Sequence, residues 1–214
     1  MGPFIQHLVD EHKQIKLLLA FLSQKVGSVL AGALDDAKLV NDILDRVSFL
    51  VEFVHHGKEE ELLFPALIDK NCLNQGGPKC TYFMGLRLDS NPCDFIFSEA
   101  QRRSPPMKVP DWNPQLADLL KRNQFLEVPC EEHAAGSLAV KMMKEEVLHI
   151  INDRVDQLSK LSKIHSEYQR LLRLHIEKED NCLFLIADSS LSHVEQVSLL
   201  NLAVEKNREL KVSP

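Results

Sequence analysis

A histidine followed four residues later by a glutamate occurs twice in this chain of 214 residues. The pairs are His55 with Glu59 and His175 with Glu179. Four residues advance an α-helix by about 400°, so each histidine lies on the same face as its glutamate, one turn away. A histidine nitrogen and a carboxylate oxygen placed in this way can ligate one first-row metal ion, or two adjacent ones.

Each pair is preceded by another histidine at nearly the same separation. His12 lies 43 residues before His55, and His133 lies 42 residues before His175. In both copies Leu-Phe follows the glutamate at the same distance. The sequence therefore predicts one helical hairpin used twice, which gives four core helices.

Apolar residues at spacings of three and four accompany these histidines. In the first stripe, His12 takes a position between Leu8 and Ile15, where a core residue is expected. Aliphatic residues dominate the apolar content, since aromatic residues make up only 6% of the chain, and this favours a helical bundle. We expect an all-α fold with a first hairpin over 5–69, a second over 130–188 and a short C-terminal helix over 191–210.

Residues 70–129 break the helical pattern. This stretch contains most of the prolines, three cysteines and the only tryptophan. It reads as a long irregular insert with one short helix near 114–125. Its cysteines lack the CxxC spacing of a zinc ribbon, so packing is the default expectation for them.

Composition excludes some classes of function. The net charge of −6 leaves no basic stripe for phosphates, so nucleic-acid binding is not expected. No apolar run approaches the roughly 20 residues that span a bilayer. The odd count of 5 cysteines and the lack of a signal peptide favour a reducing, cytoplasmic location.

Two antiparallel hairpins bring six polar side chains to one level of the core. Four imidazoles and two carboxylates suit a pair of non-haem iron ions bridged by the carboxylates. The alternative is a set of hydrogen-bonded core residues, which requires six separate polar placements in an apolar interior. The predicted metal ligands are His12, His55, Glu59, His133, His175 and Glu179.

Other polar residues near these positions fit less well. His56 lies about 100° from His55 on a regular helix, so we expect it off the site, and Glu60 is expected in solvent.

Tyr168 shares the face of His175 and is either a ligand, a hydrogen-bond donor at the metal or an ordinary core residue. Cys182 offers thiol chemistry or simple packing. Glu52 is a candidate partner for a ligand, three residues before His55.

The spacing His…HisxxxGlu in two copies, with Lys-Glu-Glu-Glu-Leu-Leu-Phe-Pro around the first glutamate, resembles the hemerythrin-like (HHE cation-binding) family. The resemblance covers residues 5–69 and 129–188. It implies a single domain over 1–214: an up-down-up-down four-helix bundle with an oxo- or hydroxo-bridged di-iron centre at the six positions named above. The second copy has Leu185 where the family usually has proline, and four aligned histidines are found where respiratory hemerythrins have five. The site therefore resembles more closely the four-histidine sites of bacterial relatives.

This resemblance leaves three hypotheses for function. The first is binding or sensing of O2, NO or peroxide at an open iron position. The second is repair of iron–sulfur clusters, iron donation or reaction with NO or peroxide. The third is a structural metal site with a protein partner bound by the insert 70–129. Zinc or manganese can replace iron in such a site.

Overall fold

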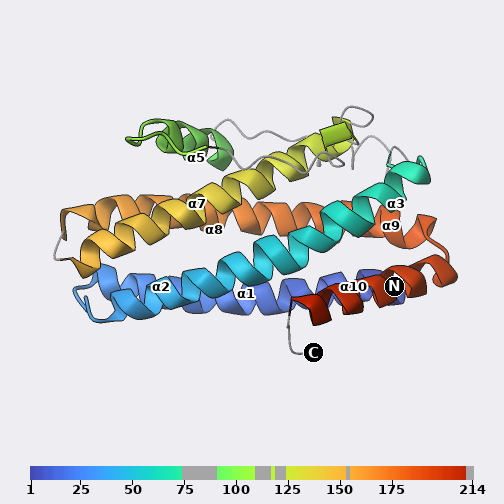
Figure 1. Ribbon diagram of the computed structural model, residues 1–214, viewed down its shortest axis with the longest axis horizontal. Coiled ribbons are helices and arrows are strands. Elements are labelled where there is room, and N and C mark those ends of the chain that lie inside the picture. The colour runs from blue at the N-terminus through green and yellow to red at the C-terminus, as the bar shows by residue number, and fades with distance from the viewer. Residues whose placement is uncertain (74–90, 109–116, 119–123, 153–154, 211–214) are drawn as a thin grey trace.

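The computed structural model describes residues 1–73, 91–108, 117–118, 124–152 and 155–210. All regular secondary structure in these residues is helical. Figure 1 shows the long helical segments lying side by side, as an up-down-up-down bundle requires. The all-α, hemerythrin-like bundle expected from the sequence is confirmed.

The four segments follow the two predicted hairpins. The first hairpin pairs α1 with a segment that continues from α2 through two π-helical stretches into α3. The second pairs α7 with a segment that continues from α8 through a π-helical stretch into α9. Their bounds are α1 (Pro3–Leu30), α2 (Asp36–Val47), η1 (Ser48–His56), η2 (Glu59–Leu63), α3 (Phe64–Asp69), α7 (Glu127–Ile151), α8 (Leu158–Lys178), η5 (Glu179–Leu183) and α9 (Phe184–Ser190).

A short turn at Gly32 connects the two helical segments of the first hairpin. Gly32 has φ +100°, a left-handed conformation that residues with a Cβ rarely adopt. Its backbone N–H donates to the carbonyl of Val29, and the chain then enters α2 at Asp36. The connection is short, so α1 and α2 are antiparallel neighbours.

The core consists of two apolar clusters at different levels of the bundle. One contains Ile15, Leu22 and Leu44 and fills the part nearer the α1–α2 turn. The other contains Leu8 and Phe64 and lies towards the opposite end. The predicted polar residues fall between the two clusters along all four segments, so apolar side chains cover them above and below.

Shorter helical elements also occur among the described residues: α5 (Pro92–Gln101) and the 3₁₀ turns η3 (Gln124–Leu126) and η4 (Val155–Gln157). The ten-residue α5 packs against α7 and α8, and it is a helix that the expected irregular insert over 70–129, with its one short helix near 114–125, did not include. Asn91 caps it by accepting a hydrogen bond from the Cys93 N–H at 3.0 Å, which the Asn-Pro sequence favours. The short helix expected near 114–125 falls mostly outside the described residues.

The expected C-terminal helix is α10 (His193–Glu209), which lies against α1 outside the bundle (Figure 1). Ser192 and Glu195 form a reciprocal capping box at its start. Within the described ranges, no helix is both long enough and apolar enough to cross a bilayer.

Candidate metal centre

The four segments bring two groups of possible metal ligands together in the polar layer between the two apolar clusters, which we call the metal layer. One group is His12, His55, Glu59 and Glu179, and we call it the two-histidine group. The other is His56, Glu59, His133 and His175, and we call it the three-histidine group. Within each group the nearest ligand atoms lie within 4.8 Å of one another. All six residues predicted from the sequence are present, and Glu59 belongs to both groups.

The two carboxylates lie between histidines of different groups. Glu59 has Oε1 3.6 Å from Nε2 of His55 and Oε2 3.5 Å from Nε2 of His133. The Oε2 atom of Glu179 is 3.3 Å from Nε2 of His12 and 3.3 Å from Nε2 of His175. Each carboxylate therefore reaches both groups, which is the placement that a bridging ligand needs.

Carboxylates on the outer side fix the orientation of two of these rings. Nδ1 of His12 lies 2.7 Å from Asp180, and Nδ1 of His133 lies 2.7 Å from Glu60. Asp180 directly follows Glu179 in the sequence and Glu60 directly follows Glu59, so each acid belongs to the hairpin opposite its histidine. Glu60 was expected in solvent, and that expectation is wrong because its side chain reaches across to the second hairpin.

The other two rings are held from within their own hairpin. Nδ1 of His55 lies 3.0 Å from Glu11, and Nδ1 of His175 lies 3.0 Å from Glu132. An ionised carboxylate can only accept a hydrogen bond, so Nδ1 is the protonated nitrogen in each case. In the neutral imidazole this leaves a lone pair on Nε2, directed at the centre of the layer.

The atoms that point into this layer lack hydrogen-bond partners. They are buried Nε2 atoms and carboxylate oxygens, and no hydrogen bond satisfies any of them among the described residues. An unpaired polar atom in the interior is costly, because it has lost water without gaining a partner. A cation coordinated by these atoms would satisfy them, so the residues present fit a metal. The atoms are Nε2 of His12, His55, His133 and His175, and both side-chain oxygens of Glu59 and Glu179.

Electrostatics support the same interpretation. Burial and the neighbouring Glu179 carboxylate raise the pKa of Glu59 well above its usual range. Burial and the nearby His12 lower the pKa of His55 to about 4, which keeps this imidazole neutral at pH 7. Two close carboxylates beside a neutral imidazole in a buried layer form an environment that a cation stabilises.

His56 is part of this layer, so the expectation that it lies off the site is wrong. The side chain is 3% exposed, and its ring stacks on that of His133 with centroids 3.6 Å apart. The estimate from a regular helix failed because Ser48–His56 is π-helical. A π-helix turns through a smaller angle per residue than an α-helix does, so His55 and His56 both face inward.

Two other residues considered from the sequence have ordinary explanations. Tyr168 is 1% exposed and lies in the larger apolar cluster, which favours the interpretation as a core residue. Cys182 is disulfide-bonded, so it has no free thiol for chemistry at the centre. Cys72, Cys93 and Cys130 are free and buried, and they provide packing.

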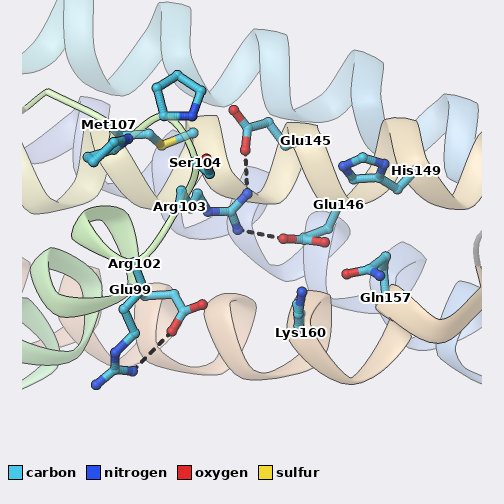
Figure 2. A pocket seen from close by; sticks show the side chains of 12 residues that line it. Glu99, Arg102, Arg103, Ser104, Met107, Glu145, Glu146, His149, Gln157 and Lys160 are labelled. Atoms are coloured by element: carbon cyan, nitrogen blue, oxygen red, sulfur yellow. Dashed lines mark hydrogen bonds and ion pairs between the residues drawn. The ribbon is translucent and has the colours of Figure 1, made fainter.

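A separate cavity of about 490 Å³ lies between α5, α7 and α8, near their ends away from the metal layer. Figure 2 shows Arg103 at its centre, paired with both Glu145 and Glu146, while Arg102 pairs with Glu99. The arginines of this cavity are therefore paired with carboxylates, although Nε of Arg103 and Oε2 of Glu146 make no hydrogen bond to another described residue. The unpartnered ligand atoms make the metal layer the stronger candidate for function.

Comparison with known proteins supports the interpretation of the first hairpin. Residues 4–79 match the family model described as "Hemerythrin HHE cation binding domain". No curated protein and no solved structure matches the chain. The matched segment contains His12, His55 and Glu59, and the second hairpin repeats their arrangement with His133, His175 and Glu179. The resemblance seen in the sequence is therefore confirmed over residues 4–79, which match the HHE cation-binding domain of the hemerythrin family.

Proposed function

We propose that the chain holds two metal ions, iron in the native protein, one in the two-histidine group and one in the three-histidine group. Glu59 and Glu179 would bridge them. The observation that carries this proposal is the set of buried, unpartnered Nε2 and carboxylate atoms that converge from four helical segments. Ligand type does not select iron over zinc or manganese, since imidazole and carboxylate suit all three.

The two metal positions differ in the number of protein ligands. If both glutamates bridge, the two-histidine group supplies four ligand residues and the three-histidine group supplies five. The difference is His56, because Ile176 takes the corresponding position after His175. A six-coordinate metal in the two-histidine group would therefore keep more positions for an external ligand.

We infer that this external ligand is O2, NO or peroxide. Iron with an open position binds or reduces such small molecules, and the chain contributes the apolar surroundings that limit access of water. Phe184 stacks on the ring of His12 with centroids 5.1 Å apart, so one side of the two-histidine group is aromatic. Binding or sensing is favoured over thiol-dependent chemistry because Cys182 has no free thiol.

Metal analysis of ligand variants tests the proposal. His55→Ala and His175→Ala should each reduce the iron content of the purified chain by well over half, since each removes a ligand from a shared centre. His193→Ala is the matched control, because His193 is exposed at the start of α10, and it should leave the iron content unchanged. Unchanged iron content in both ligand variants would contradict the assignment.

A further inference from the structure

Each hairpin contains the same arrangement of glutamate, histidine and lysine on the outer side of the metal layer. In the first hairpin, Glu11 accepts from Nδ1 of His55 at 3.0 Å and from the ammonium of Lys58. In the second, Glu132 accepts from Nδ1 of His175 at 3.0 Å and from the ammonium of Lys178. Both glutamates use Oε2 for the histidine and Oε1 for the lysine. A repeated set of contacts of this kind indicates a shared role.

The lysines are buried to an unusual degree. Lys58 is 0% exposed and Lys178 is 5% exposed. A buried ammonium is costly unless it is paired, and each of these is paired with the glutamate that also holds a histidine. Each lysine–glutamate pair is neutral overall. The lysine therefore holds the carboxylate at a second point without adding net charge beside the metal layer.

The geometry ties each ring to both helices of its hairpin. The lysine lies three residues after the histidine on the same helical segment, whereas the glutamate comes from α1 or α7. A carboxylate held at both oxygens cannot rotate away from the imidazole, so the ring is fixed with Nε2 towards the centre. The acids on His12 and His133 differ, because Asp180 and Glu60 keep 25% and 22% of their side chains exposed.

We propose that Glu11 and Glu132, each anchored by its buried lysine, are positioning residues that orient His55 and His175 before a metal arrives. This inference rests on the proposed metal centre and assigns the outer residues that shape it. Because His55 belongs to the two-histidine group and His175 to the three-histidine group, each glutamate should act on a different metal position.

Titration of the full-length apoprotein with Co²⁺, followed by absorption spectroscopy and chelator competition, tests this inference. Glu11→Gln and Glu132→Gln keep the shape and an acceptor oxygen but lose the charge that anchors the lysine. We expect each to weaken one of the two Co²⁺ sites by about 10–100-fold and to change its absorption bands. The double variant should weaken both sites. Asp10→Asn on α1 and Glu177→Gln on α8 are the control substitutions, because these carboxylates are about half exposed, and they should change neither affinity nor spectrum.

Thermal unfolding of the metal-free proteins separates positioning from stability. Glu11→Gln combined with Lys58→Met removes both charges, so no buried ammonium is left unpaired, and its apoprotein should fold. Weakened Co²⁺ binding in the folded variant that combines Glu11→Gln with Lys58→Met would support the role of Glu11 as a positioning residue. Wild-type affinity and spectrum in the glutamine variants, with or without lower apoprotein stability, would overturn it. A wild-type chain that binds no Co²⁺ would instead contradict the metal centre itself, and this inference with it.

Discussion

At the scale of single residues, the hydrogen bond of each histidine ring decides which of its nitrogens is free to bind a metal ion. Nδ1 of His12, His55, His133 and His175 each faces a carboxylate, so Nε2 is left to ligate. The arrangement is the same in both hairpins, with one acid from the same hairpin and one from the other. His56 is the exception to this symmetry, and it makes the two proposed metal positions unequal.

Substitution of His56 tests that inequality. His56→Ala should leave the two-histidine group intact and remove one ligand from the three-histidine group. We expect metal content to fall from about two ions towards one per chain, because a lost imidazole weakens one position more than the other. Inductively coupled plasma mass spectrometry measures this directly. Full occupancy in the variant would show that His56 only packs against His133.

Six residues of this layer could be predicted from the sequence, and each of the others was missed for a physical reason. His12, His55 and their counterparts follow a regular stripe, so a helical wheel finds them. His56 was missed because the wheel assumes a uniform turn, which the π-helical stretch does not have. Glu11 and Glu132 adjoin His12 and His133 in the sequence, but their contacts with Lys58 and Lys178 depend on packing between helices, which no local pattern reports.

At the scale of elements, π-helical stretches mark both copies of the site. Glu59–Leu63 and Glu179–Leu183 each begin at one of the two buried glutamates of the layer and are five residues long. The first is followed by Pro65 and the second by Leu185 at the same place, so proline is not required for this distortion. Wide turns of this kind are frequent at functional sites.

Glu52 links η1 to α7 one turn from the metal layer and provides a test by pH. Its Oε2 atom accepts from the Ser137 hydroxyl at 2.9 Å, and burial raises its pKa above the ordinary 4.5. A raised pKa means that stability is fully present below about 4.5 and is lost as the pH rises through the folded-state value. Glu52→Gln cannot ionise and should escape that loss.

Melting temperatures across a pH series measure the effect. The difference between Glu52→Gln and wild type should be near zero below pH 4.5 and become positive as the pH rises. Asp42→Asn, at an exposed position of the preceding helix, is the control and should show no such trend. A variant that is less stable than wild type at high pH would show that the charged form of Glu52 is favoured.

At the scale of the whole molecule, two copies of one hairpin enclose a polar layer between two apolar clusters. The bundle and both hairpins were predictable from the stripes and the repeat, because four amphipathic helices have few ways to bury their apolar faces. The packing of α5 on α7 and α8 was not predictable, since the Pro-rich insert carries no long periodic pattern. The disulfide at Cys182 was also missed, because pairing depends on proximity in space.

Metal content and the visible spectrum of anaerobically purified protein, before and after exposure to air, test the central claim most directly. The account predicts about two irons per chain, one for each ligand group, and absorption bands that grow when oxygen is admitted. One metal ion or none per chain, with no spectral response to air, would contradict a di-iron centre that reacts with oxygen.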